Sequence, residues 1–301
     1  MSLQPAGGKP RRWAGGIIRR LAPGFGSRRE FDRYVRQWVL PPDLPESDLS
    51  SFRPRDRIGH GGIDLRPDEQ LALLARWKTS RADLFRSLRE DPRINTRCPG
   101  QDRIHNGTYP TPDAEIYAAM ILDHRPPSIV EIGAGYSTMI ARKVSSEHGL
   151  QSRITVIDPE PRADVRGHAD VIINRRVEEI GADHLPLDGG ALLFIDSSHI
   201  ARARGDIPQI YNKILPSVPA GTLVHVHDVF IPYDYPFLYQ KRLYTEQYVL
   251  HALLAHSRRY RVVMATHFLS REHTSEMQAV FGPAVGTDDL YWGASLWFQV
   301  E

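Results

Sequence analysis

The stretch Glu131-Ile-Gly-Ala-Gly-Tyr-Ser-Thr138 decides the fold class of this chain. An apolar run, Ser128 to Ile132, leads directly into this glycine-rich turn, and a helical pattern begins immediately after it. Gly133 and Gly135 can take positive φ and let the backbone approach a ligand, while the free N–H groups of the next helix point into the turn. The stretch therefore predicts a strand, a tight turn and a helix that bind a nucleotide-like cofactor.

A second strand pattern, Arg153-Ile-Thr-Val-Ile157, ends in the carboxylate of Asp158. In nucleotide-binding sheets an acid at a similar distance in sequence after the glycine turn binds the ribose hydroxyls. Asp158 is therefore predicted to hold a ribose. This arrangement also fits an NAD-binding sheet. The position of the third glycine of a dinucleotide site is here Thr138, which counts against that alternative.

Composition limits the function classes that remain. With 301 residues, 41% of them hydrophobic, the chain can bury a substantial core. The net charge of +2 argues against a general nucleic-acid binder, which needs a concentrated basic surface. One cysteine, Cys98, excludes an intrachain disulfide framework and favours a cytoplasmic location. Because no apolar run approaches ~18 residues, no membrane span is expected.

Strand patterns alternate with helical patterns from residue 128 onward, which indicates a parallel sheet covered by helices. The expected strands are 128–132, 153–157, 170–173, 191–195, 222–226, 260–265 and 294–300. The expected helices run from the turn to about 147, over 202–214 and over 245–257. Helical spacing over 67–90 predicts an accessory helical layer ahead of the sheet.

Polar side chains follow the fourth and fifth strands of this pattern. Asp196-Ser-Ser-His199 follows one, and His227-Asp228 follows the other. The carboxyl ends of parallel strands meet at one edge of a sheet, where ligands bind. Clustered ionisable groups are typical of functional sites, although strand-end capping and salt bridging use the same residue types. His225 lies two residues before His227 in the same strand pattern, and we expect it to be a packed core residue.

The glycine turn, the two polar strand ends and the segments 109–117 and 246–248 together resemble the class I S-adenosylmethionine-dependent methyltransferases, in particular an uncharacterised bacterial subgroup (Methyltransferase 24-like). The resemblance covers roughly residues 105–300. It implies a doubly wound, seven-stranded, mostly parallel sheet with an antiparallel last strand, and S-adenosylmethionine as the cofactor. The predicted cofactor-binding residues are Tyr109, Glu131, Gly133, Ala134, Gly135, Tyr136, Ser137, Thr138, Asp158, Pro159, Arg176, Val177, Asp196, Ser197 and Ser198.

Some of these assignments carry a specific role. Glu131 stands where a carboxylate can orient a cationic amino-acid ligand, and Arg176 with Val177 lies where methyltransferases cover the adenine ring. An exposed basic turn is the alternative for that pair. The whole chain is expected to comprise a basic tail over 1–60, the accessory helical layer over 61–104 and the methyltransferase domain over 105–301.

A hydroxyl acceptor requires a group that removes its proton, because the cofactor already carries the leaving group. His199 or His227 can take this proton near neutral pH, with Asp228 fixing the tautomer. The alternative is a divalent metal held by Asp196, His227 and Asp228, which would bind a diol. That placement is similar to catechol-type O-methyltransferases, but an imidazole stands where magnesium prefers an acid, so the metal is not favoured.

The segment 229–239 contains five aromatic residues and two prolines. It is expected to form a wall for a sugar-containing or aromatic acceptor, or a hydrophobic cover over the accessory helices or a second subunit. The sequence thus predicts O-methylation of a small-molecule or carbohydrate acceptor and leaves homo-oligomerisation open. The alternatives are an NAD-dependent oxidoreductase and a non-catalytic cofactor-binding module.

Overall fold

The computed structural model describes residues 62–161, 164–181, 184–236, 239, 242–283 and 293–301. These residues belong to a compact unit that spans Pro54–Glu301. A second unit, Met1–Arg53, lies outside the described residues, and so does the basic tail expected over 1–60. Among the described helices, none combines the length and the apolar composition that crossing a bilayer requires.

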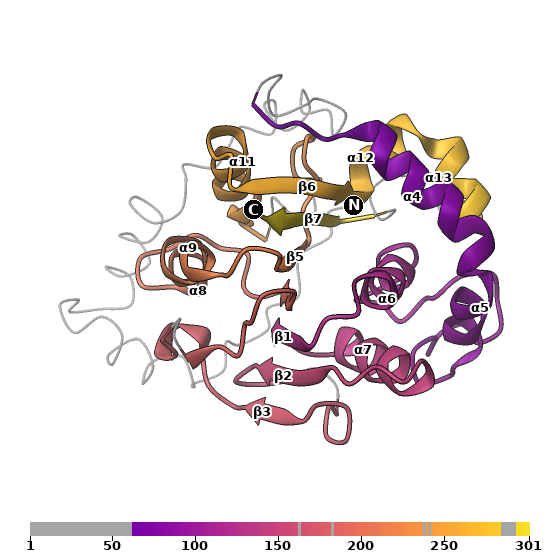
Figure 1. Cartoon of the computed structure of the whole chain (residues 1–301), viewed down its shortest axis with the longest axis horizontal. Coiled ribbons are helices and arrows are strands. Elements are labelled where there is room, and N and C mark those ends of the chain that lie inside the picture. The colour runs from indigo at the N-terminus through magenta and orange to yellow at the C-terminus, as the bar shows by residue number, and fades with distance from the viewer. Residues whose placement is uncertain (1–61, 162–163, 182–183, 237–238, 240–241, 284–292) are drawn as a thin grey trace, which may run out of the picture. The chain divides into compact units, whose positions relative to one another are not determined.

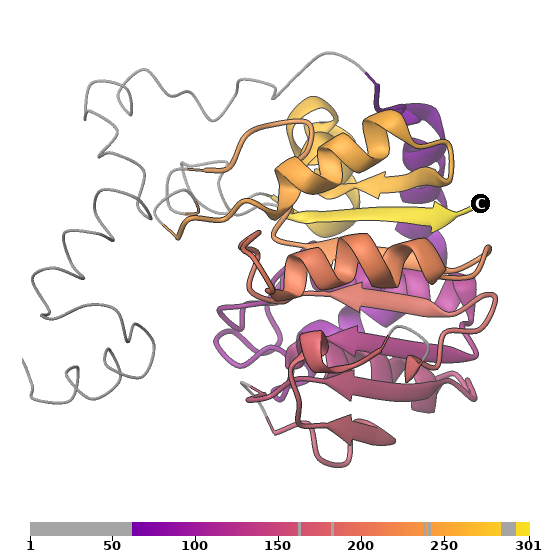
Figure 2. The ribbon, with the colours of Figure 1, turned by 90° about the vertical axis from the view of Figure 1, so that its left-hand side faces the viewer.

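A seven-stranded sheet with the order β3-β2-β1-β4-β5-β7-β6 occupies the centre of this unit. One strand, β7, is antiparallel to both of its neighbours, β5 on one side and β6 on the other. Figure 2 shows the yellow β7 pointing opposite to the parallel strands. The predicted fold class is confirmed. The strands are β1 (Ser128–Ile132), β2 (Arg153–Ile157), β3 (Val171–Ile173), β4 (Leu192–Ile195), β5 (Leu223–His227), β6 (Tyr260–Ala265) and β7 (Ser295–Val300).

The central strands are short apolar runs whose residues are all buried, as parallel strands covered on both faces must be. Their register aligns Ile132 of β1 with Ile157 of β2 and with Ile195 of β4. Ile195 in turn pairs with Val226 of β5. Because the four strands end level with one another, the polar residues that follow them meet at one edge of the sheet.

Helices cover both faces of the sheet, as Figure 1 shows. One face carries α6 (Asp113–His124) and α7 (Tyr136–Glu147), with α4 (Pro67–Ser80), α5 (Ala82–Glu90), α12 (Thr266–Glu272) and α13 (Thr274–Phe281) beyond them. The other face carries α8 (Asp206–Gln209), a π-helical segment (Ile210–Ile214), α9 (Leu215–Ser217) and α11 (Glu246–His256).

The helix predicted over 202–214 begins later than expected, at Asp206. Residues before it form a turn in which Gly205 N donates to Arg202 O and Arg204 has a φ of +60°. A left-handed residue at position 204 is incompatible with a continuous α-helix. The helical run therefore starts at Asp206 and continues through the π-helical segment to Ser217.

The accessory helical layer predicted from the sequence consists of α4 and α5, and it shares the hydrophobic core of the sheet. Trp77 of α4 and Leu88 of α5 are fully buried. The side-chain oxygen of Gln70 accepts a hydrogen bond of 2.8 Å from the backbone N–H of Ala265, at the end of β6. These contacts join the layer to the far edge of the sheet.

Candidate active site

Close packing requires glycine at the first glycine position of the turn between β1 and α7. Gly133 has a φ of +94°, and a Cβ added to it would lie 2.0 Å from the backbone oxygen of Asp196. The strand end of β4 therefore packs directly against this turn. The positive φ expected for Gly135 is wrong: its φ of 171° is extended, and no described atom lies within 4 Å of the point where a Cβ would stand.

The carboxylate of Asp158 holds this turn by binding a backbone N–H group of the turn. One carboxylate oxygen accepts a hydrogen bond of 2.9 Å from Ala134 N, and the other accepts one of 2.8 Å from Glu160 N. The carboxylate lines a cavity of about 340 Å³, which we call the glycine-turn cavity. Predicted cofactor-binding residues along its walls are Gly133, Ala134, Asp158, Pro159, Arg176, Val177, Asp196, Ser197 and Ser198.

Glu131 and Thr138 lie beneath the turn, and neither lines the glycine-turn cavity. Both are fully buried. The Glu131 carboxylate accepts hydrogen bonds from the Tyr117 hydroxyl (2.8 Å) and from the Thr138 hydroxyl, and Thr138 accepts one from Gly135 N. Burial raises the pKa of Glu131 to about 7. The structure thus places this predicted pair where it can support the turn from inside.

A second cavity of about 210 Å³, the tyrosine cavity, lies beside the turn. Asn106 fixes its outer loop because the amide oxygen accepts from Thr108 N and Tyr109 N. The Tyr109 hydroxyl is buried and has no hydrogen-bond partner among the described residues. The cavity is lined by Asn106, Thr108, Tyr109, Ala134, Gly135, Tyr136, Ser137 and Asp196. All of these except Asn106 and Thr108 are predicted cofactor-binding residues.

The third cavity, of about 370 Å³, contains the three predicted catalytic residues, His199, His227 and Asp228, and we call it the histidine cavity. Asp113, which sequence reasoning missed as a site residue, also lines it. One Asp113 oxygen accepts a hydrogen bond of 2.8 Å from Ala294 N and lies 3.8 Å from His227 Nε2. In the sequence this acid has the ordinary pattern of a helix start, so no signal marked it.

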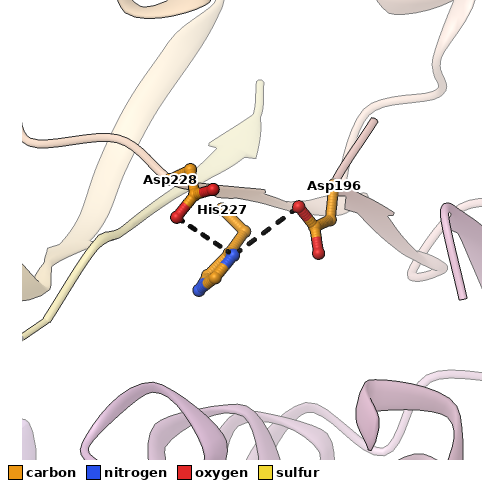
Figure 3. A group of neighbouring side chains, drawn as sticks. All are labelled: Asp196, His227 and Asp228. Carbon is orange, nitrogen blue, oxygen red and sulfur yellow. Dashed lines mark ion pairs between the residues drawn. The ribbon is translucent and has the colours of Figure 1, made fainter. Parts of the chain in front are cut away.

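The imidazole of His227 lies between two carboxylates (Figure 3). Its Nδ1 is 3.6 Å from Asp196 Oδ1 and 3.7 Å from Asp228 Oδ1. This nitrogen is buried and makes no hydrogen bond within the described part of the chain. Burial lowers the pKa of His227, but the carboxylates of Asp228 and Asp196 outweigh it and raise the pKa to about 9.

The same three residues have the arrangement of a metal site. Asp196, His227 and Asp228 each offer a ligand atom, and these atoms lie within 4.8 Å of one another. Two carboxylate oxygens and one imidazole are a donor set that divalent cations accept in proteins. The buried Nδ1 without a hydrogen-bond partner fits a cation, because a metal would replace the missing partner. Asp228 has a φ of +55°, a strained conformation of the kind that collects at functional sites.

His199 is held by carboxylates on both sides of its ring. Nε2 lies 3.1 Å from Asp196 and 3.6 Å from Asp228, and Nδ1 lies 2.8 Å from Glu246. Burial lowers the pKa of His199, but the hydrogen bonds to Asp196 and Glu246 outweigh it and hold the pKa well above its usual range. A ring that keeps its proton near neutral pH does not accept another. This geometry counts against His199 as the general base expected from the sequence.

Asp196 lines the glycine-turn, tyrosine and histidine cavities. Asp196 directly follows β4. The loop after it is fixed because Ser198 donates two hydrogen bonds of 2.7 Å to the carboxylate of Asp206, from its backbone N and its hydroxyl. Burial raises the pKa of Asp196, but His227 and His199 outweigh that effect and hold it well below its usual range. A single ionised carboxylate therefore stands where the three cavities meet.

The described aromatic residues after β5 contribute to a small hydrophobic cluster and to the histidine cavity. Phe230 and Tyr235 are fully buried and pack with Tyr239 and Ala294 in a small hydrophobic cluster. Tyr239 also lines the histidine cavity, together with Arg242 and Tyr244. His225, by contrast, is a core residue as expected, since its ring is fully buried and stacks on Trp297 with centroids 4.1 Å apart.

Part of the chain is similar to known proteins. Residues 130–229 match the family model of a methyltransferase domain. An uncharacterised protein of Archaeoglobus fulgidus is 39% identical over 111 residues, which are 36% of this chain and 48% of that protein. The chain therefore spans about half the length of this curated relative.

Several solved methyltransferases overlap with the chain at low identity. An S-adenosylhomocysteine-bound methyltransferase of Podospora anserina is 16% identical, with 87% of this chain and 98% of that one covered and a TM-score of 0.42. A TehB-like S-adenosylmethionine-dependent methyltransferase of Corynebacterium glutamicum is 11% identical, with 78% and 100% covered and a TM-score of 0.35. Both TM-scores are below 0.5. The fold class rests instead on the strand order of the sheet.

The family match runs from Val130 in β1 to Val229, directly after β5, and so includes both polar strand ends. The seven-stranded sheet with its antiparallel β7 has the fold class predicted from the sequence. Over residues 130–229 the chain is thus similar to a methyltransferase domain.

Proposed function

We propose that this protein transfers the methyl group of S-adenosylmethionine to a hydroxyl oxygen of a polar small molecule bound in the histidine cavity. The observation that carries the proposal is the position of Asp196, which lines all three cavities. The adenosine part is assigned to the glycine-turn cavity, where Asp158 would bind the ribose and Val177 would lie against the adenine. The amino-acid part is assigned to the tyrosine cavity, so that the sulfonium faces the histidine cavity.

The lining of the histidine cavity supports an oxygen acceptor. Among the lining residues, Asp113, His227 and Asp228 provide hydrogen-bonding groups, and Tyr239 and Tyr244 provide aromatic rings. The guanidinium of Arg242 lies 5.2 Å from the centroid of Tyr239 and 5.9 Å from that of Tyr244. A hydroxylated ring, either a sugar or a phenol, could stack on the tyrosines while its hydroxyl groups face the acids.

A divalent cation at Asp196, His227 and Asp228 is the arrangement that best explains the buried Nδ1 of His227. Such a cation lowers the pKa of a bound hydroxyl and fixes its orientation. We therefore favour metal-assisted transfer to a diol over the metal-free base that the sequence suggested. The chain's own residues would hold the cation, keep the acceptor oxygen close to the sulfonium and neutralise charge beside it.

Metal-free catalysis by His227 remains the second candidate, and one contact favours it. Asp113 lies 3.8 Å from His227 Nε2, so it could orient an imidazole that takes the acceptor proton through Nδ1. With its pKa at about 9, however, His227 would be mostly protonated near pH 7. This mechanism therefore requires alkaline conditions.

The test is methyl transfer from labelled S-adenosylmethionine to a panel of catechols, sugars and sugar acids, with and without a chelator. We expect transfer to acceptors with two adjacent hydroxyls, loss of transfer with the chelator and recovery with Mg²⁺ or Mn²⁺. Asp228→Asn should lose metal-dependent transfer and still bind S-adenosylhomocysteine. Chelator-resistant transfer that increases up to pH 9 would establish the metal-free mechanism. Failure to bind S-adenosylhomocysteine would contradict the cofactor assignment.

A further inference from the structure

We propose that His199 and Glu246 form a positioning pair that sets the carboxylates of Asp196 and Asp228 for the cation. The inference rests on the proposed metal centre. It concerns two buried residues behind that centre: His199 is 2% exposed and Glu246 is fully buried. Glu246 lines none of the cavities described above, so it cannot act by touching the acceptor or the cofactor.

The backbone of His199 is fixed by the start of α11. His199 has a φ of +60°, which is unusual for a residue with a side chain. Its carbonyl oxygen accepts hydrogen bonds from Thr245 N (2.8 Å) and Glu246 N (3.0 Å). The first N–H groups of a helix have no partner within the helix, so they are free to bind this oxygen. The helix start thus keeps the loop after β4 in its left-handed conformation.

The ring of His199 is fixed by the same helix start. Glu246 Oε2 lies 2.8 Å from Nδ1, and the other Glu246 oxygen accepts a hydrogen bond of 2.9 Å from the Tyr211 hydroxyl. Both oxygens of this buried carboxylate are therefore engaged. With Nδ1 directed at Glu246, the opposite nitrogen of the ring must point toward the metal-ligand carboxylates.

Nε2 of His199 reaches both of these carboxylates, at 3.1 Å from Asp196 Oδ1 and 3.6 Å from Asp228 Oδ2. The two oxygens of Asp228 are thereby divided: Oδ2 faces His199, and Oδ1 faces His227 Nδ1 at 3.7 Å. Neighbouring carboxylates repel each other unless a donor or a cation lies between them. His199 supplies that donor from behind, which leaves Asp228 Oδ1 directed at the cation position, while Asp196 Oδ1 contacts His199 and also faces His227 Nδ1 at 3.6 Å.

Hydrogen-bond partners of metal ligands orient them, and their loss typically lowers metal affinity about 10- to 100-fold. A direct contact is not required for such an effect. Glu246 is two contacts away from the cation position, yet it determines where the ring of His199 points. We therefore assign to this pair control over metal affinity, with no role in cofactor binding.

The experiment measures Mn²⁺ binding by the full chain from the electron paramagnetic resonance signal of free Mn²⁺. Glu246→Gln and His199→Gln are compared with the wild type and with Tyr211→Phe. The last variant is the matched control, because it removes the other partner of Glu246 and leaves the contact with His199 intact. S-adenosylhomocysteine affinity, measured by calorimetry, reports whether the neighbouring cofactor site is still folded.

We expect Glu246→Gln and His199→Gln to weaken Mn²⁺ binding about 10- to 100-fold, with S-adenosylhomocysteine affinity unchanged. Tyr211→Phe should keep the wild-type Mn²⁺ affinity. Wild-type Mn²⁺ affinity in the first two variants would overturn the inference while the proposed metal centre stands. If the wild type itself binds S-adenosylhomocysteine and no Mn²⁺, the metal centre and this role both fail. Should Glu246→Gln lose cofactor binding through misfolding, His199→Gln decides the question.

Discussion

His227 and Asp196 face each other across 3.6 Å, with the imidazole Nδ1 directed at a carboxylate oxygen and no hydrogen bond between them. With the pKa of His227 at about 9, the ring carries a proton that must leave before Nδ1 can bind a cation. Mn²⁺ affinity is therefore expected to rise about tenfold per pH unit up to pH 9 and to level off above it. Calorimetry in buffers of different ionisation enthalpy counts the released proton; a flat profile from pH 7 to 9 contradicts the assignment.

Gly133 and Gly135 offer a matched pair of substitutions. Gly133→Ala brings a Cβ against the backbone oxygen of Asp196, so we expect a marked loss of thermal stability. Gly135→Ala has room for its Cβ and an extended backbone, so the fold should be retained. Because Gly135 lines the tyrosine cavity, the same methyl group should weaken S-adenosylhomocysteine binding. Equal melting temperatures for both variants would refute the packing argument.

Replacement of Asp158 by alanine tests the ribose assignment. The carboxylate lines the glycine-turn cavity and also accepts the Ala134 N–H, so both ligand contacts and turn geometry depend on it. We expect S-adenosylhomocysteine affinity to fall by about 1.5 to 3 kcal/mol, the usual contribution of hydrogen bonds to a charged group. Asp164→Ala is the control, since that exposed aspartate between β2 and β3 lines none of the three cavities. Calorimetry that gives the same affinity for Asp158→Ala and wild type would remove Asp158 from the site.

Glu131→Gln should change how stability depends on pH. The pKa of Glu131 is raised to about 7, so the folded state binds this proton more tightly than the unfolded state does. The protonated Glu131 contributes fully to the free energy of unfolding below the pKa of the unfolded state, about 4.5. This contribution is lost as the pH rises through the folded-state pKa of about 7. Relative to wild type, Glu131→Gln should gain stability between pH 5 and 8, by up to about 3 kcal/mol. Urea titrations at pH 5 and pH 8 measure the free energy of unfolding of both proteins. A difference between them that does not change with pH would be evidence against a buried protonated acid.

Arg242 is predicted to recognise an anionic substituent on the acceptor. Its guanidinium is exposed, lines the histidine cavity and lies against the rings of Tyr239 and Tyr244. Guanidinium groups bind carboxylates and phosphates in bidentate fashion. Arg242→Gln should therefore raise KM for an acidic acceptor and leave kcat unchanged, whereas the KM for a neutral analogue should stay the same. The exposed Arg258→Gln serves as the charge-matched control, and an equal effect on both acceptors would contradict the prediction.

Local sequence patterns were sufficient for the parts of the site that lie next to strand ends. The strand, turn and helix around Gly133 follow from residue order alone, and so does the position of Asp158 after β2. His227 and Asp228 were also expected at the edge of the sheet, because parallel strands that end level bring their following residues together.

The remainder of the site depends on contacts between distant parts of the chain. Asp113 becomes a site residue only because its carboxylate binds Ala294 N, 181 positions away, and approaches His227. His199 and His227 are the same residue type in similar sequence settings, yet His199 has a carboxylate, that of Glu246, 2.8 Å from its second nitrogen, whereas Asp113 lies 3.8 Å from that of His227. Gly135 resembles Gly133 in the sequence, but the two differ in φ, and only Gly133 packs against the backbone oxygen of Asp196.

The hydrogen bond between Gln70 and Ala265 limits how far this protein can be shortened. A truncated form that started at residue 105 would remove α4 and α5, leaving the amide of Ala265 and the surface that buried Trp77 open to water. Loss of that much apolar contact is expected to favour aggregation of the recombinant product. Any shortened form intended for expression should therefore keep α4 and α5.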